Sequence, residues 1–308
     1  MSYWLLVTRS FRIAWDHKYL WLLAIFSGES GGSFNYSQRT TRTSSSNLSD
    51  VQQQFSTWIS SHIVLLVSIG VVWLVLVVAF FILAAVCEAA TIRGSAEHDA
   101  ERPFGLGSAW RTGVHLMWVM VRFRLLLVAL GLPLFLLVGA WLITLLAAVA
   151  NGNAGAAVPL LLSGLLLFGV GIVYAIYLSF LGQFGARAVV LEERMAAPAV
   201  ARAHRLLFKR FGRALLVWLV ALGVSLVVVI SLGIVLAPFA AIAATAIASG
   251  SAASVAAGVL VASVVVVVFI PIAAYLAAQS STYWTLAFRR LDLDYAAAPV
   301  AYPAVPQA

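Results

Sequence analysis

The chain contains 308 residues, of which 63% are hydrophobic and only 10% are charged, and its mean hydropathy is +1.02. Soluble domains are about 45–50% apolar and about 25% charged, so this composition excludes a soluble globule and indicates a protein whose solvent is lipid. The net charge of +8 points to anionic lipid as a partner, and away from nucleic acid.

Three long stretches, residues 51–87, 125–186 and 214–288, contain no Lys, Arg, Asp or Glu. A membrane-spanning helix needs about 20 apolar residues. The first stretch therefore has room for one span and each of the others for two, with turn residues at 151–155 and 249–254 between the paired spans. We expect five spans near Ile63–Cys87, Leu125–Val149, Val158–Gly182, Leu215–Ile247 and Val255–Gln279.

Residues 13–27 are expected to form a sixth, thinner span. If this segment crosses, 17 of the 19 basic residues lie on the side that the positive-inside rule assigns to the cytoplasm. The chain is then a multi-pass membrane protein with both termini in the cytoplasm. Two alternatives remain open, namely that this segment lies flat on the inner surface or that it belongs to a cleaved signal peptide.

The chain also has an internal repeat, with units at about 1–90, 105–190 and 197–290. In each unit a basic helix precedes two spans, and Glu88, Gln183 and Gln279 close the second span at separations of 95 and 96 residues. We therefore predict one all-α membrane domain over residues 1–290, with six transmembrane helices arranged as three parallel hairpins about a pseudo-threefold axis. Chance similarity among hydrophobic helices is the alternative.

The helix that leads each unit is expected to be amphipathic and to lie in the plane of the lipid headgroups. A cation near an anionic leaflet contributes about 1 kcal/mol of binding, although the same charges could serve only to fix topology. The candidate headgroup contacts are Arg9, Arg12, Arg111, Arg122, Arg202, Arg205, Lys209 and Arg213.

Little in the sequence indicates catalysis. The densest cluster of potential metal ligands, Glu97 to Glu101, is expected in a solvated cytoplasmic loop before Pro103. We expect no enzyme activity, no metal and no cofactor. Residues 28–61 are read as a polar extracytoplasmic loop, and residues 291–308 as a disordered cytoplasmic tail.

Four short motifs carry a resemblance to a known group of proteins. They are Ile92-Arg-Gly-Ser95, Phe104-Gly-Leu-Gly-Ser-Ala-Trp-Arg111, Ala186-Arg-Ala-Val-Val-Leu-Glu192 and Tyr283-Trp-Thr-Leu-Ala-Phe-Arg-Arg-Leu291. The chain resembles uncharacterised bacterial six-span membrane proteins that are similar to the membrane domain of some glycerophosphoryl diester phosphodiesterases. The resemblance implies an inner-membrane module with a basic helix before each hairpin, and it implies no phosphodiesterase activity because the catalytic barrel is absent.

Two functions are consistent with these features. The first is a non-enzymatic membrane protein that engages anionic lipid, or a membrane or cytoplasmic partner protein, through its basic helices. The alternative is a transporter of small molecules or lipids, with Glu88, Gln183 and Gln279 as a polar ring at the inner mouth of a pathway. These three residues could equally meet headgroups or cap neighbouring helices.

Overall fold

The computed structural model describes residues 3–27, 58, 60–152 and 154–291, and these residues form helices without strands. The loop expected at 28–61 and the tail expected at 291–308 fall almost entirely outside this range. The helices are α1 (Tyr3–Asp16), α2 (Tyr19–Ser27), α4 (Ile63–Asp99), α5 (Leu106–Ala150), α6 (Ala154–Leu191), α7 (Ala196–Lys209), α8 (Phe211–Ala248) and α9 (Ala252–Leu291).

Five of these helices, α4, α5, α6, α8 and α9, are long and apolar enough to cross a membrane. This confirms the prediction of an all-helical protein with several spans. The breaks after α5 and α8 fall where the turn residues predict them, and Gly152 (φ 66°) and Gly250 (φ 73°) occupy the left-handed region there. Glycine adopts this conformation without the steric penalty that a Cβ imposes.

The sixth span is not present as a single helix, because the chain breaks inside residues 13–27. Helix α1 ends at Asp16, and α2 has nine residues, which rise only about 14 Å against a hydrocarbon core of about 30 Å. At the break the ring of His17 stacks on the ring of His98 of α4, with the ring centroids 3.4 Å apart. Helix α2 packs against α4 and α9. Packing of these two short helices onto the long ones therefore replaces the predicted crossing, and the structure has five candidate spans.

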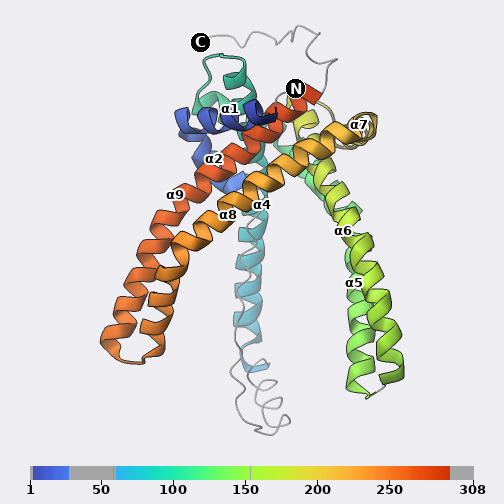
Figure 1. Ribbon diagram of the computed structural model, residues 1–308, viewed down its shortest axis with the longest axis vertical. Coiled ribbons are helices and arrows are strands. Elements are labelled where there is room, and N and C mark those ends of the chain that lie inside the picture. Colours follow the sequence, from blue (N-terminus) through green and yellow to red (C-terminus); the bar gives the residue numbers. More distant parts are fainter. Residues whose placement is uncertain (1–2, 28–57, 59, 153, 292–308) are drawn as a thin grey trace.

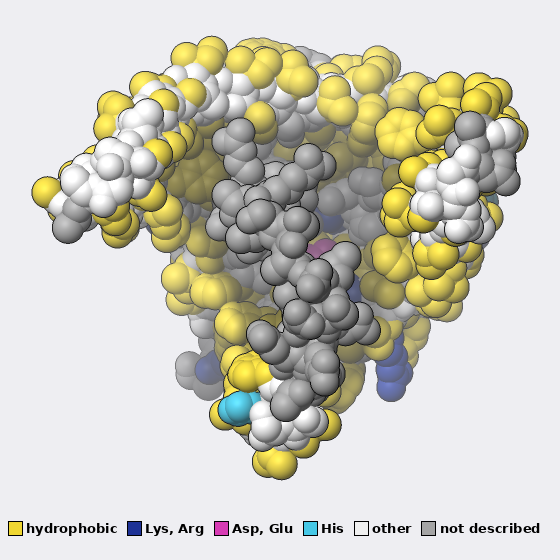
Figure 2. All heavy atoms as spheres, turned by 90° about the horizontal axis from the view of Figure 1, so that it is seen from below, with side chains coloured by type: hydrophobic (Ala, Val, Ile, Leu, Met, Phe, Trp, Pro, Cys, Tyr) yellow, Lys and Arg dark blue, Asp and Glu magenta, His cyan; other side chains and the backbone are white. Residues whose placement is uncertain are grey.

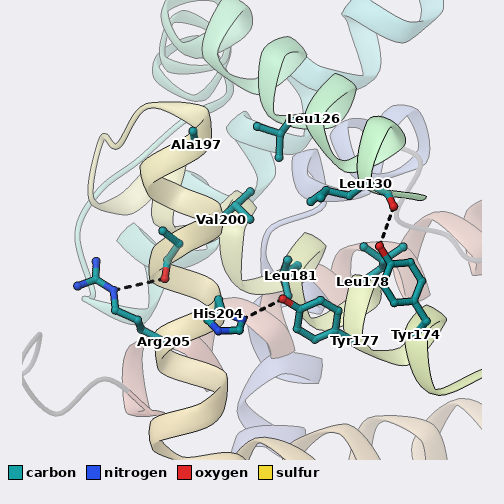
Figure 3. A pocket seen from close by; sticks show the side chains of 11 residues that line it. Leu126, Leu130, Tyr174, Tyr177, Leu178, Leu181, Ala197, Val200, His204 and Arg205 are labelled. Atoms are coloured by element: carbon teal, nitrogen blue, oxygen red, sulfur yellow. Dashed lines mark hydrogen bonds between the residues drawn. The ribbon is translucent and has the colours of Figure 1, made fainter. Parts of the chain in front are cut away.

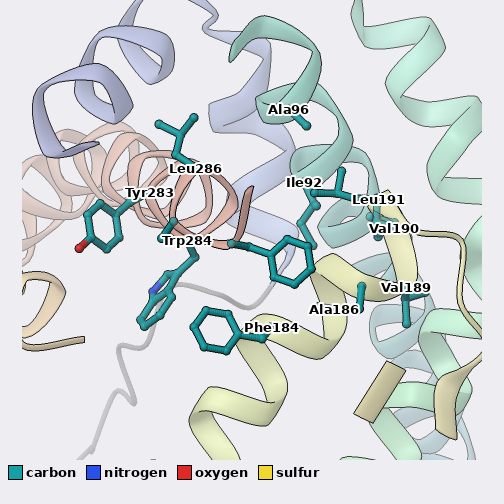
Figure 4. Packing of buried hydrophobic residues seen from close by; sticks show 14 of the residues in the cluster. Ile92, Ala96, Phe184, Ala186, Val189, Val190, Leu191, Tyr283, Trp284 and Leu286 are labelled. Carbon is teal, nitrogen blue, oxygen red and sulfur yellow. The ribbon is translucent and has the colours of Figure 1, made fainter. Parts of the chain in front are cut away.

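The helices form a packed head from which three legs extend (Figure 1). We define the head as residues 3–27, 81–127, 176–221 and 274–291, and the legs as the remaining parts of α4, of the α5–α6 pair and of the α8–α9 pair. All residues of the main buried hydrophobic cluster lie in the head. Figure 4 shows part of this cluster, where Phe184 meets Trp284 edge to face with ring centroids 5.8 Å apart.

The legs bury almost nothing. In the most apolar window of each long helix, at most 6% of the residues are buried. The leg segments, from 18 residues in α4 to 27 residues in α8, rise about 27–41 Å, which is close to the thickness of a hydrocarbon core of about 30 Å. Seen from the leg tips, the described surface is mostly hydrophobic, with few charged side chains in view (Figure 2). The legs therefore have the length and the surface of membrane-embedded helices.

The basic helices that were expected to lead each unit differ among themselves. Helices α1 and α7 are separate short helices, whereas the basic segment of the middle unit continues without a break into the 45-residue helix α5. The middle unit therefore lacks a separate interfacial helix, because nothing between Leu106 and Arg124 interrupts the helical hydrogen bonding.

Candidate functional site

The structure divides the eight predicted headgroup contacts into two groups. Arg9 and Arg202 are held in ion pairs inside the protein, with Asp99 at 2.8 Å and Glu192 at 3.3 Å respectively. The other six side chains are exposed at the head: Arg12, Arg111, Arg122, Arg205, Lys209 and Arg213.

Asp99, the last residue of α4, joins three helices. Its two carboxylate oxygens lie 2.8 Å from Nε of Arg9 on α1 and 2.6 Å from Nη1 of Arg289 on α9. The same arginines donate to backbone carbonyls at this end of α4, those of Asp99 and Ala96. Cations at a helix C-terminus interact favourably with the helix dipole, so the pair of arginines both caps α4 and fixes α1 and α9 to it.

The prediction of a solvated loop at Glu97–Glu101 is therefore wrong for its first three residues. They lie within α4, and Glu97 is 7% exposed with Nε of Arg93 at 3.0 Å. His98 lies against α2, where Oη of Tyr19 is 2.7 Å from its Nε2. Burial raises the pKa of Tyr19 far above its usual range, so this hydroxyl stays protonated.

Glu88, the first of the three predicted inner-mouth residues, is paired with Arg124 of α5. Nη2 and Nε of Arg124 lie 2.6 and 2.8 Å from Oε2 of Glu88. Nη2 also donates to the carbonyls of Ser27 (2.6 Å) and Ala84 (3.1 Å). Because Ser27 is the last residue of α2, Arg124 joins the end of α2 and an interior turn of α4 to α5.

The other two predicted inner-mouth residues have different partners. Oε1 of Gln183 accepts a hydrogen bond from Nη1 of Arg187 at 2.7 Å, and the fully buried Arg187 also donates to the carbonyl of Ser281 on α9. Nε2 of Gln279 donates to Oγ of Ser10 on α1 at 3.1 Å. All three residues lie in the head, each against a different neighbour, and a shared polar ring stays a prediction.

Sequence reasoning overlooked Arg124, Asp99 and Arg187, which organise the head. A signal for one of them was present. Glu88 directly follows the first charge-free stretch and Arg124 directly precedes the second. Consecutive antiparallel spans end at the same depth, so opposite charges in these two positions are expected to meet.

Comparison with known proteins gives a family without an assigned role. Residues 7–289 match the model described as "Family of unknown function (DUF7544)". No curated protein and no solved structure matches the chain.

Proposed function

The chain belongs to this family of unknown function, and from its own surfaces we propose that it is a non-enzymatic integral membrane protein whose cytoplasmic face engages anionic lipid or a partner protein. The observation that carries the proposal is the exposure of arginines around the head. Arg12, Arg111, Arg122, Arg205 and Arg213 are all exposed, and none of them forms an ion pair with an acid among the described residues.

Four acids of the head, in contrast to these arginines, form ion pairs within the protein. Glu88, Glu97, Asp99 and Glu192 are each engaged by arginines within the protein. The other acids of the described head, Asp16, Glu101 and Glu193, are exposed, but exposed lysines and arginines outnumber them there. At about 1 kcal/mol for each cation near an anionic leaflet, five exposed arginines supply a substantial attraction to such a surface.

The same charges support an orientation in which the head faces the cytoplasm and the hairpin turns face outward. Helices α1 and α2 lie in the head, and α4 begins at the leg tips (Figure 1). In this orientation α4 is entered from the outside of a bacterial inner membrane and the C-terminal end of α9 lies inside. A cytoplasmic N-terminus needs a sixth crossing before α4, and none of the described helices supplies it.

The finer plan of the fold is also part of this proposal. The α5–α6 and α8–α9 legs match the second and third units of the internal repeat and support parallel repeats, whereas the first unit contributes the single helix α4 to its leg. The resemblance to the membrane domain of glycerophosphoryl diester phosphodiesterases supports an integral inner-membrane module. Transport, the alternative function, has less support, because Glu88, Gln183 and Gln279 bind separate neighbours in the head.

The test compares the lipids that co-purify with two variants. In the first, the five exposed arginines are changed to glutamine; in the matched control they are changed to lysine, which keeps the charge. We expect the anionic fraction of co-purified lipid to fall several-fold in the glutamine variant and to stay near the wild-type value in the lysine variant. Equal lipid composition and equal protein partners in all three samples would contradict the proposal. The substituted residues are Arg12, Arg111, Arg122, Arg205 and Arg213.

A further inference from the structure

A cavity of about 500 Å³ opens between α5, α6 and α7, at the boundary between the head and one leg (Figure 3). Leu126 and Leu130 of α5 face Leu178 and Leu181 of α6 across it, and Val200 of α7 closes one side. Ligand pockets typically measure about 300–1,000 Å³, so this cavity is large enough for part of a small amphiphile.

The hydroxyl groups of the two tyrosines in the cavity wall already form hydrogen bonds within the protein. Oη of Tyr174 donates to the carbonyl of Leu130 at 2.7 Å, and Oη of Tyr177 lies 2.9 Å from Nδ1 of His204. A ligand inside the cavity therefore meets mainly leucine, valine and aromatic carbon. Such a lining favours a hydrocarbon chain, since each buried CH₂ contributes to binding.

The rim of the cavity carries positive charge. Arg205 of α7 lines it and is exposed. Arg122 is exposed on α5 one helical turn before Leu126, and residues four apart share a helix face. None of the residues that line the cavity is acidic. The rim therefore favours an anionic group next to an apolar slot.

The position of the cavity fits one occupant in particular. Its α5 and α6 walls belong to the charge-free stretch 125–186, and neighbouring residues such as Leu125 and Val128 are more than half exposed on the outer surface. Helix α7 is basic and packs against α5 and α6; in the proposed orientation it lies where headgroups meet acyl chains. The opening is therefore reached from the lipid.

We propose that this cavity binds one anionic phospholipid, with an acyl chain between α5, α6 and α7 and the phosphate on Arg205. The assignment rests on the proposed engagement of anionic lipid and gives it a defined site. Arg122 adds attraction for the phosphate, and the pair formed by Tyr177 and His204 joins α6 to α7 and keeps the slot open.

Native mass spectrometry of the purified protein with added phosphatidylglycerol tests the site. We expect the wild type to retain one phosphatidylglycerol and to bind phosphatidylcholine of the same chain length less tightly. Losing one cation should weaken binding about five-fold, so Arg205→Gln should lower affinity by that factor, whereas Arg205→Lys should restore most of it. Lys18→Gln, at an exposed cation that does not line the cavity, is the control and should bind like the wild type.

Variants that fill the cavity distinguish this lipid site from the general proposal that the exposed arginines engage anionic lipid. Ala201→Trp keeps every charge but occupies the cavity, and we expect it to lose the retained lipid; Val200→Phe serves if the tryptophan variant does not elute like the wild type. Glycerol phosphate, which has no acyl chain, should not compete. If a slot-filling variant retains the lipid as the wild type does, or if glycerol phosphate competes, the site is overturned while the general proposal stands. The general proposal fails instead if the five-arginine glutamine variant keeps its anionic lipid.

Discussion

Arg124→Gln removes the guanidinium that faces the carboxylate of Glu88 and that holds α2, α4 and α5 together. Glu88 is 8% exposed, and the variant loses both bonds to its Oε2 together with the two bonds to the carbonyls of Ser27 and Ala84. Removing one partner of a buried ion pair costs about 3–5 kcal/mol. Because the Arg124 side chain is 18% exposed, we expect about 3 kcal/mol. At about 2–4 °C per kcal/mol for larger domains, the unfolding temperature should fall by about 6–12 °C.

Intrinsic fluorescence of the ten tryptophans during heating of the detergent-purified protein measures this shift. Arg111→Gln is the matched control, since Arg111 is an exposed arginine on the same helix, and exposed substitutions usually change stability by less than about 0.5 kcal/mol. Glu88→Gln should cost less than Arg124→Gln, because the two carbonyls still accept from the guanidinium. Exchanging the two charges should not restore stability, since a carboxylate at position 124 would face carbonyl oxygens. Equal unfolding temperatures for Arg124→Gln and Arg111→Gln would refute the assigned role of this pair.

Two further predictions concern helix contact and orientation. A Cβ at Gly113 would lie 2.4 Å from the carbonyl oxygen of Val86, so Gly113→Ala should lower the unfolding temperature. Gly139→Ala on the same helix meets nothing within 4 Å and should leave the temperature unchanged or raise it, because alanine favours helix by up to about 1 kcal/mol over glycine; shifts of equal sign and size would contradict the close α4–α5 contact. In intact cells, Asn151→Cys should react with a membrane-impermeant maleimide and Gly107→Cys should react only after permeabilisation, and the reverse pattern would overturn the proposed orientation.

Local patterns in the sequence were sufficient for the long helices. Charge-free stretches fixed five of them, and the glycines at 152 and 250 marked the turns, because both signals act over a few consecutive residues. The break after Asp16 was different. It depends on packing of α1 and α2 against α4 and α9 and on the stacking of His17 on His98. These contacts join residues that are 79 positions apart for α2 and α4, and 264 apart for α1 and α9. Local sequence patterns do not predict contacts between residues so far apart in the chain.

The same limit applies to the candidate site. In the sequence all the head arginines look alike, as cations beside apolar runs. In the structure Arg9 and Arg289 converge on Asp99 from 90 and 190 positions away, while Arg205 and Arg213 remain exposed. Which arginines are available to a ligand is therefore decided by tertiary contacts, and only the total positive charge of the head could be predicted.

The legs have a mechanical consequence. Beyond the head, α5 continues from residue 128 to Ala150, about 34 Å at 1.5 Å per residue, with almost no contact to the other two legs to hold its angle. A rotation of about 10° where α5 leaves the head would move its outer tip by about 6 Å. The leg therefore acts as a lever that pivots beside the cavity between α5, α6 and α7, so a small change of packing where α5 leaves the head becomes a displacement several times larger at the tip of the leg.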